Sequence, residues 1–431
     1  MLSPPEADLV RRDGVLPGLA TVLDPDALLA ALAPALPTAD VRAASVRYVR
    51  YKPHTNCLVA YRLDVAGAES QTMDIHAKVH RLDAPEKLGK ARQRAPVPGR
   101  LGVGRIVLED RGLVVWAFPN DLRLRTVRRL TDRHARARLL RRLVPDRPEL
   151  WAGTLETLRY KPERRYVARL ETASGAQAVL KVHAAPRYDR AAAGAAAFRS
   201  CPPLRVPRLL GRGDAEGIVA LEWLTGRLLA AALADGAVAL ATVTAVGAAL
   251  GELHSQRCSS LPTIEPGMEA AGLLDLAADL AFLCPDLARA AQDLAGRLAA
   301  RLREPSPARC PIHGDFYAEQ VLLDDAGVAI FDLDRAALGD PAADLGTFIA
   351  HLEREALHGG LPADRVPALR EALLEGYRTV TRRPPPPGVD FYTAVGLFRI
   401  APEPFRGREP DWPERIAAVL ARANVAALAA S

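Results

Sequence analysis

Three polar residues, Asp315, Gln320 and Asp332, flank one short hairpin pattern in the sequence. The apolar runs 321–323 and 328–331 are separated by Asp-Asp-Ala-Gly, which is typical of a tight turn. Because a hairpin brings its two ends side by side, we expect two carboxylates and one amide oxygen to converge there. Oxygen ligands of this kind, with room left for water and phosphates, suit Mg²⁺ bound together with a nucleotide.

Lys181 is a candidate for the positive charge that such a site requires. Phosphoryl transfer needs a carboxylate to orient the incoming hydroxyl, oxygen ligands for the metal and a lysine on the phosphates. The apolar run 178–182 predicts a strand that could carry this lysine to the site. Lysine is rare in the chain, accounting for six of the 57 basic residues, whereas arginine accounts for 51 (57 minus 6). A lysine in such an arginine-rich chain indicates a position where a planar guanidinium would not serve.

Four of those lysines belong to an internal repeat. The tetrapeptide RYKP occurs at 50–53 and again at 159–162, and a Lys-Val-His segment follows each copy, with Lys78 and Lys181 in equivalent places. In each copy the intervening residues predict antiparallel strands, and a further apolar strand then ends in a turn. We therefore expect two related β-rich modules in the first half of the chain.

After about residue 228 the sequence becomes predominantly helical in pattern. Four Ala- and Leu-rich segments have helical length and apolar spacing: 228–254, 268–303, 365–380 and 413–430. The order of elements predicts an α+β fold, with β-rich modules first and a mostly helical region after them.

Composition limits the class of protein. With 431 residues, 49% of them hydrophobic and 25% charged, the chain has the balance of an ordinary globular protein, which excludes global disorder, collagen and coiled coils. The net charge of +6 suits mild attraction to anions such as nucleotides and does not require a nucleic-acid partner.

Cysteine usage and hydropathy favour the cytoplasm. The five cysteines are odd in number, far apart and without Cys-x-x-Cys spacing, which favours a reduced compartment. The N-terminal residues MLSPPEADLVRRDG lack the apolar stretch of a signal peptide. The longest uncharged run, 236–251, is shorter than the roughly 20 apolar residues that span a membrane. We therefore expect a cytoplasmic protein with no membrane partner.

The segment 310–348 resembles the aminoglycoside phosphotransferase and maltokinase-like group of small-molecule kinases. The likeness rests on one ordered series of motifs: His313-Gly314-Asp315, Gln320, Asp332, Gly339-Asp340-Pro341 and Asp344-Leu345. It extends over roughly residues 155–430, where Leu250-Gly251-Glu252-Leu253-His254 resembles a helix end of the same group. The resemblance implies a bilobal protein-kinase-like fold with a β-rich N-lobe and a mostly helical C-lobe.

The resemblance also implies roles for individual residues. Asp315 would be the catalytic carboxylate, Gln320 and Asp332 would hold Mg²⁺, and Lys181 would reach the phosphates of ATP or GTP. The nucleotide base would bind at the hinge between the lobes, formed by Glu222, Trp223 and Leu224.

Neighbouring polar residues are interpreted mainly as structural. We expect His313 to stabilise its loop by hydrogen bonding rather than to transfer protons, and Asp344 to cap a helix or brace the catalytic loop. His254 is expected to pack or to cap a helix. For Asp334 two interpretations stay open, in which it faces either the metal or a substrate hydroxyl.

Three departures from the family pattern bear on these roles. Most of the group has Asn where this chain has Gln320, but maltokinase-like relatives carry Gln, which keeps the amide carbonyl with one more methylene. The helix predicted after Lys181 offers only Asp189 in place of the usual glutamate partner. No glycine-rich loop precedes Lys181, and the turn 161–165 occupies its place, with two arginines as candidate phosphate contacts.

The resemblance and the repeat together predict three domains. These are an N-terminal cap (1–148) that is a degenerate duplicate of the kinase N-lobe, the N-lobe itself (149–226) and a helical C-lobe with the catalytic and metal site (227–431). Because no His-Gly-Asp segment follows copy one, we expect copy two to be the working N-lobe. The cap is then either a packed duplicate or an added binding surface, and a second nucleotide site at Lys78 is a lesser alternative.

The function that these observations favour is ATP- or GTP-dependent, Mg²⁺-dependent transfer of the γ-phosphoryl group to a hydroxyl of a small molecule. By the resemblance, the acceptor would be a sugar, an amino sugar or an aminoglycoside-like compound. A nucleotide-binding pseudokinase-like module without transfer activity is the alternative, and a protein kinase ranks below it because the chain lacks a DFG motif. Four aromatic residues are candidates for stacking on a sugar ring: Tyr317, Tyr377, Tyr392 and Trp412. The oligomeric state is open.

Overall fold

The computed structural model describes residues 1–36, 40–66, 71–93, 95–98, 101–236, 238–304 and 309–430. The chain forms two compact units, each assembled from three segments. The first unit comprises Met1–Arg142, Leu155–Ala168 and Glu403–Pro413. The second unit comprises Leu143–Thr154, Arg169–Pro402 and Glu414–Ser431.

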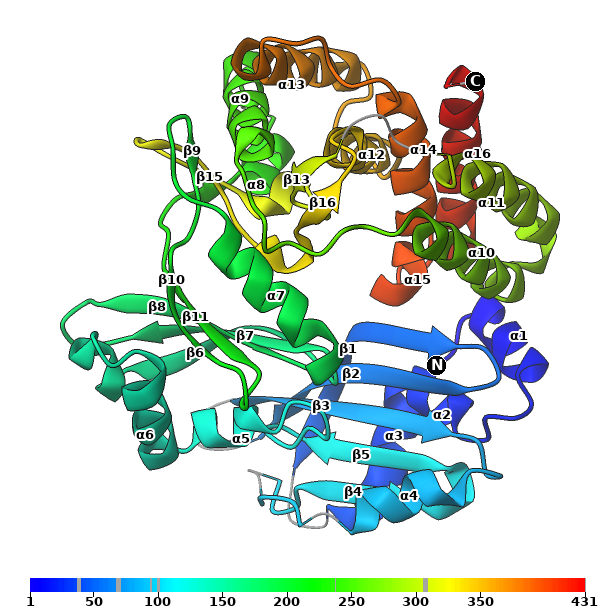
Figure 1. Ribbon diagram of the computed structural model, residues 1–431. Helices are drawn as coiled ribbons and strands as arrows, with labels where there is room; N and C mark the ends of the chain where they lie inside the picture. Colours follow the sequence, from blue (N-terminus) through cyan, green and yellow to red (C-terminus); the bar gives the residue numbers. More distant parts are fainter. Residues whose placement is uncertain are drawn as a thin grey trace. The chain divides into compact units, whose positions relative to one another are not determined.

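The first unit is built on a five-stranded antiparallel sheet with the order β1-β2-β3-β5-β4 (Figure 1). Its strands are β1 (Val41–Lys52), β2 (Asn56–Val65), β3 (Gln71–His80), β4 (Arg105–Leu108) and β5 (Leu113–Ala117). Its helices are α1 (Pro4–Arg12), α2 (Leu19–Leu23), α3 (Pro25–Leu32), α4 (Pro85–Arg92), α5 (Thr126–Thr131) and α6 (Arg133–Leu143), of which α6 ends in the second unit. Helices α2 and α3 pack against β1, β2 and β3, because their leucines and the central strands are both apolar and buried.

The second sheet repeats the order of the first, β6-β7-β8-β11-β10. Its strands are β6 (Thr154–Lys161), β7 (Arg165–Glu171), β8 (Gln177–His183), β10 (Leu209–Gly213) and β11 (Ile218–Glu222). Helix α7 (Ala185–Ala197) follows β8 as α4 follows β3. Lys78 pairs with Val114 and Lys181 pairs with Val219, each the second residue of its strand. The repeat, and the equivalence of the two lysines, are therefore confirmed.

The turn after RYKP has the same unusual backbone in both copies. His54 and Glu163 adopt left-handed φ values of 56° and 59°. In copy one the turn is held by Asp13, whose carboxylate accepts hydrogen bonds from the backbone nitrogen of His54 at 3.0 Å and from the Tyr51 hydroxyl at 2.5 Å. A buried carboxylate thus stabilises a conformation that non-glycine residues rarely adopt.

Asp121 does the same for copy two. Its carboxylate accepts hydrogen bonds from the backbone nitrogen of Glu163 at 2.8 Å and from the Tyr160 hydroxyl at 3.0 Å. Asp13 precedes its tyrosine by 38 residues and Asp121 precedes its own by 39. The repeat therefore begins well before the RYKP motif, which sequence analysis missed because a lone aspartate carries no pattern.

The helical region consists of more and shorter helices than predicted. They are α8 (Leu229–Ala234), α9 (Leu240–Ser255), α10 (Pro266–Leu283), α11 (Ala288–Leu302), α12 (Ala342–Leu357), α13 (Arg365–Thr381), α14 (Val389–Ile400), α15 (Glu403–Gly407) and α16 (Trp412–Ala429). The predicted helix 228–254 is broken at Gly236, which adopts a φ of 70°, and the predicted helix 268–303 is broken at Pro285, which cannot donate the helical hydrogen bond. Short 3-10 helices are η1 (Ala33–Ala35), η2 (Glu109–Arg111), η3 (Pro148–Ala152), η4 (Pro285–Leu287), η5 (Ala318–Gln320) and η6 (Leu333–Arg335).

Two small sheets accompany these helices in the second unit. One has the order β12-β14-β15-β9, with β12 (Arg227–Leu228), β14 (Val321–Asp324), β15 (Gly327–Ile330) and β9 (Leu204–Arg205). The other pairs β13 (Cys310–Ile312) with β16 (Ala337–Gly339). One apolar core joins β9, β14 and β15 to α9, α12 and α13. It fixes the loops that leave the strands.

No helix in the described segments is long and apolar enough to cross a membrane. All five cysteines are free thiols.

Candidate active site

The hairpin formed by β14 and β15 brings Gln320 and Asp332 to the same end, as the sequence predicted. The strands pair from Asp324 with Gly327 at the turn to Val321 with Ile330 at the open end. One residue further, the backbone nitrogen of Phe331 donates to the carbonyl oxygen of Gln320 at 3.0 Å. Gln320 therefore lies directly before the paired ladder, and Asp332 lies two residues after it.

Asp315 lies on a loop that Asp344 braces. The Asp344 carboxylate, at the start of α12, accepts hydrogen bonds from the backbone nitrogens of His313 at 2.6 Å and Gly314 at 2.8 Å. Gly314 has a φ of 77°, and a Cβ atom there would lie 2.2 Å from the carbonyl oxygen of Arg335. The loop thus requires glycine at this position, and the predicted bracing role of Asp344 is confirmed.

His254 supports the brace from the opposite side. Its Nε2 lies 3.0 Å from the Asp344 carboxylate and its Nδ1 lies 3.1 Å from the Tyr377 hydroxyl. Burial raises the pKa of Asp344, but the contacts with His254 and His313 together outweigh it, so the pKa lies below its ordinary value. Asp344 is therefore a buried anion, and His254 is its hydrogen-bond partner.

His313 links the Asp315 loop to the exit of the hairpin. The backbone nitrogen of Asp315 donates to His313 Nδ1 at 3.3 Å, so Nε2 carries the proton that it donates to the carbonyl oxygen of Phe331 at 2.8 Å. Both ring nitrogens are engaged and the residue is fully buried. This geometry agrees with the predicted structural role of His313.

Lys181 reaches the exit of the same hairpin from β8. Its Nζ donates to Asp332 Oδ1 at 2.5 Å and to Asp334 Oδ1 at 2.8 Å. Burial lowers the pKa of Lys181, but the two carboxylates outweigh it and raise the pKa above its ordinary value. The exposed Asp189 on α7 is not among these partners. The carboxylates beyond β15 therefore supply the partner that sequence analysis left in doubt.

Helix α7 packs closely on the segment that follows Asp332. A Cβ atom at Gly194 would lie 2.0 Å from the carbonyl oxygen of Leu333. Arg190 donates to the carbonyl oxygens of Arg335 at 2.5 Å and Ala336 at 3.4 Å. Sequence analysis missed both residues, although a glycine inside an alanine-rich helix is a sign of close backbone approach.

Asp315 forms an ion pair that was also missed. Arg335 donates to its Oδ1 at 3.0 Å, with 40% of the aspartate side chain and 59% of the arginine side chain exposed. An exposed pair of this kind contributes about 0–1 kcal/mol, so it can open readily for another partner.

The predicted hinge residues lie at the end of β11, which Glu222 closes, and directly after it. Glu222 pairs with Ala178 of β8, and its backbone nitrogen donates to the carbonyl oxygen of Arg208 at 2.9 Å. Trp223 packs under the Arg169 guanidinium, which lies 5.3 Å from the ring centroid. Leu224 comes next, between β11 and β12.

A pocket of about 200 Å³ lies in the second unit, between the starts of α10 and α14 and the end of β16. Its charged and aromatic lining residues are Glu269, Arg301, Glu304, Arg309, Asp340, Phe391 and Tyr392. Among the aromatic candidates, Tyr392 therefore lines a pocket. Tyr377 contacts His254, Tyr317 stacks on His351 at 4.1 Å, and Trp412 is buried.

The model of the phosphotransferase enzyme family matches residues 157–392, which is more than half of the chain. The chain belongs to this phosphotransferase family. The assignment confirms the predicted resemblance, the enzyme class of a small-molecule kinase and the bilobal kinase-like fold. The match begins in β6 and contains Lys181, Asp315, Gln320 and Asp332, whereas the sheet of the first unit lies outside it.

Solved structures of phosphotransferases resemble the chain at low identity. Choline kinase from Cryptosporidium parvum Iowa II has a TM-score of 0.48 and 10% identity, over 68% of this chain and 95% of its own. A thermostable mutant of aminoglycoside phosphotransferase APH(4)-Ia, in complex with ADP and hygromycin B, has a TM-score of 0.46 and 14% identity, and the match covers 68% of this chain and 97% of that one. Macrolide 2'-phosphotransferase MphH from Brachybacterium faecium has a TM-score of 0.39 and 18% identity, and the match covers 62% of this chain and 91% of that one. No curated protein sequence matches the chain.

Proposed function

We propose that the protein transfers the γ-phosphoryl group of ATP or GTP, together with Mg²⁺, to a hydroxyl group of a small molecule. The observation that carries this proposal is the convergence of Lys181, Gln320 and Asp332 on one end of the hairpin. His313 links that end to the loop of Asp315. These are the parts that phosphoryl transfer requires.

The residues at the hairpin exit fit a magnesium–nucleotide complex. Asp332 and Asp334 offer carboxylate oxygens beside Lys181, and Gln320, which directly precedes β14, would add its side-chain amide oxygen. Within the described residues no group of three or more His, Cys, Asp or Glu side chains could hold a metal ion. Such a sparse set suits Mg²⁺, which commonly takes one or two carboxylates and completes its shell with phosphates and water. Bound there, the metal would neutralise charge on the phosphates.

Lys181 would bind the phosphates as a fixed cation. Its raised pKa keeps the ammonium group charged, because Asp332 and Asp334 stabilise the charged form despite burial. The backbone of Glu222, Trp223 and Leu224 would receive the base of the nucleotide, since these residues form the end of β11 and the segment after it, and β11 pairs with the lysine strand.

Asp315 would orient the acceptor hydroxyl and take its proton. The side chain is partly exposed, so an incoming substrate can reach it, and Arg335 holds it by a weak ion pair. The loop around it is held at His313 and Gly314 by the buried Asp344, which fixes the direction of the carboxylate.

The pocket between the starts of α10 and α14 and the end of β16 is our candidate for the acceptor site, and it would suit a sugar or an amino sugar. Three carboxylates and two guanidinium groups line it, and Tyr392, which is partly exposed, would contact a ring. Burial lowers the pKa of Arg190, while Glu269 of this pocket and Asp315 both act to raise it, so the arginine lies within electrostatic reach of both. A polycationic aminoglycoside would meet Arg301 and Arg309, which makes it the less suitable acceptor.

The test is transfer of label from γ-labelled ATP or GTP, with Mg²⁺, to a panel of monosaccharides, amino sugars, maltose and aminoglycosides. Label on one acceptor class, dependent on Mg²⁺, supports the proposal and identifies the substrate class. Nucleotide binding with no transfer to any acceptor supports the pseudokinase alternative. The absence of nucleotide binding would refute the site.

A further inference from the structure

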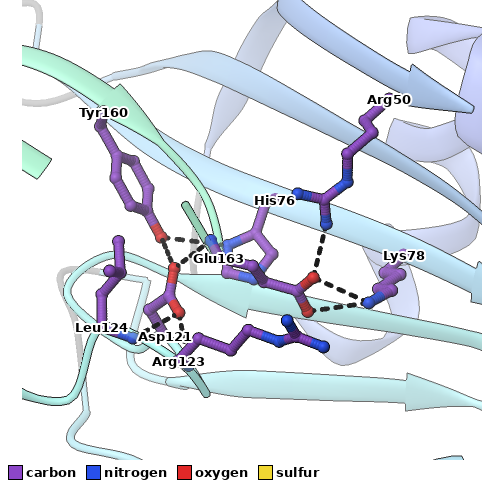
Figure 2. Close-up of polar contacts among 8 residues, drawn as sticks. All are labelled: Arg50, His76, Lys78, Asp121, Arg123, Leu124, Tyr160 and Glu163. Atoms are coloured by element: carbon purple, nitrogen blue, oxygen red, sulfur yellow. Dashed lines mark hydrogen bonds and ion pairs between the residues drawn. The ribbon is translucent and has the colours of Figure 1, made fainter. Parts of the chain in front are cut away.

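Lys78 holds in the first sheet the place that Lys181 holds in the second, but its partner is different. Lys181 contacts the carboxylates beyond the hairpin, whereas Lys78 donates to both carboxylate oxygens of Glu163, at 2.9 and 2.8 Å (Figure 2). Glu163 belongs to the turn between β6 and β7, in the second copy of the repeat. The lysine of copy one is therefore occupied by the turn of copy two.

Arg50 completes the pairing of Glu163. Its guanidinium lies 2.5 Å from Oε2 of the glutamate. Only 5% of the Glu163 side chain is exposed, against 15% for Lys78 and 18% for Arg50. Burial raises the pKa of Glu163, but the two cations outweigh it and hold the pKa at about 2. A buried carboxylate with two cationic partners is costly to break at one end, because the remaining charges would be left uncompensated.

The backbone of the same turn is held as firmly as the side chain. Asp121 Oδ2 accepts from the backbone nitrogen of Glu163, and Asp121 Oδ1 accepts from the backbone nitrogens of Arg123 at 2.8 Å and Leu124 at 2.9 Å (Figure 2). The Tyr160 hydroxyl, which also donates to Asp121, lies 3.3 Å from His76 Nδ1. The turn is thus tied to the first sheet through its carboxylate and to the segment after β5 through its backbone.

The equivalent turn of copy one places its side chain differently. His54 has the same left-handed backbone and an equivalent aspartate, Asp13, beneath it, but 52% of its side chain is exposed, and its ring contacts Asp13. The left-handed turn of the repeat therefore does not require a buried side chain.

The position of the turn indicates what the tie controls. The turn joins β6 to β7, and β7 lies next to β8, the strand of Lys181. In chain order it takes the place that the resemblance gives to a glycine-rich loop. Lys161 and Arg164 of this turn lie 5.6 and 5.8 Å from the ring centroid of Tyr48. A loop held in this way does not have to be ordered when nucleotide binds, which lowers the cost of binding.

We propose that Lys78 and Arg50, acting through Glu163, form a clamp that fixes the turn 161–165, which takes the place of the glycine-rich loop in chain order, and that the clamp thereby sets the affinity for nucleotide. This inference rests on the proposed function. Lys78 is then a positioning residue. It binds the carboxylate of Glu163, whereas its counterpart Lys181 would bind the phosphates of the nucleotide.

The test compares Glu163→Gln with His54→Gln. The second variant introduces the same glutamine at the equivalent position of the turn in copy one. Two quantities are measured in the full chain: kcat and apparent KM for nucleotide, and hydrogen exchange of the backbone amides of residues 161–165 without nucleotide. For Glu163→Gln we expect faster exchange and a KM raised about tenfold, the effect of one charge-assisted contact, with kcat within about twofold. For His54→Gln we expect neither change.

Lys78→Met provides the second variant, because it opens the clamp from the other side and should reproduce both effects. Unchanged amide exchange in a folded Glu163→Gln or Lys78→Met protein would overturn the clamp. Faster exchange with an unchanged KM would overturn its control of nucleotide affinity. If the wild-type protein neither transfers phosphate nor binds nucleotide, the proposed function fails instead, and the exchange data still report whether the clamp exists.

Discussion

The brace formed by Asp344 offers a quantitative test of how the catalytic loop is held. Its carboxylate accepts three hydrogen bonds, from the backbone nitrogens of His313 and Gly314 and from the His254 ring. Asn offers one acceptor oxygen and an NH₂ group, so Asp344→Asn places one buried donor against another donor. An unsatisfied buried donor costs about 1–3 kcal/mol, and we therefore expect the free energy of unfolding to fall by about 2 kcal/mol.

The effect should depend on pH in a defined direction. Burial raises the pKa of Asp344, but the contacts with His254 and His313 together outweigh it, and the pKa lies below its ordinary value of 3.8. The carboxylate therefore stabilises the protein above pH 3.8, and this contribution is lost as the pH falls through the lowered pKa of the folded state. The difference between wild type and Asp344→Asn should be full near neutral pH and shrink in acid.

The assay is urea unfolding followed by circular dichroism at a series of pH values. Asp340→Asn is the matched control, because Asp340 accepts a hydrogen bond from the backbone nitrogen of Ala342 near the start of the same helix, which the side-chain oxygen of Asn can also accept. Equal stability of the two variants, or a loss in Asp344→Asn that is the same at every pH, would refute the reasoning.

Three further predictions concern the lysine, the amide ligand and the close packing of α7. Lys181→Met should raise the apparent KM for nucleotide by about 10- to 100-fold in steady-state assays, and an unchanged KM would contradict its role on the phosphates. Gln320→Ala should raise the Mg²⁺ concentration for half-maximal activity by about tenfold, whereas Gln320→Asn should preserve Mg²⁺ use; equal behaviour of the two would exclude an amide ligand. Gly194→Ala should lower the thermal midpoint because its Cβ would lie 2.0 Å from the Leu333 carbonyl oxygen, whereas Gly272→Ala, with open space around it, should raise the midpoint.

The parts of the site that sequence analysis predicted are those set by local chain geometry. The hairpin places Gln320 and Asp332 together because a four-residue turn between two apolar runs leaves little freedom of register. The repeat was visible because rare lysines mark it, and the equal strand order of the two sheets follows from it.

The parts that were missed depend on contacts between distant segments. Arg335, Arg190 and Gly194 act through packing between α7 and the segment after β15, which no sequence spacing encodes. Glu163 was treated as a residue of an ordinary turn, because its partners Arg50 and Lys78 lie 113 and 85 residues away. A buried charge becomes recognisable only when its counter-charges are seen.

The most direct test of the central claim is phosphoryl transfer by Asp315→Asn, with the turn variant Asp325→Asn as control. Asp315 is tied to Arg335 rather than to Lys181, so its loss should leave nucleotide affinity near that of wild type. We predict that kcat for the best acceptor falls about 1000-fold in Asp315→Asn and stays near wild type in Asp325→Asn. Equal transfer rates in the two variants would contradict the assignment of Asp315, and with it the proposed mechanism.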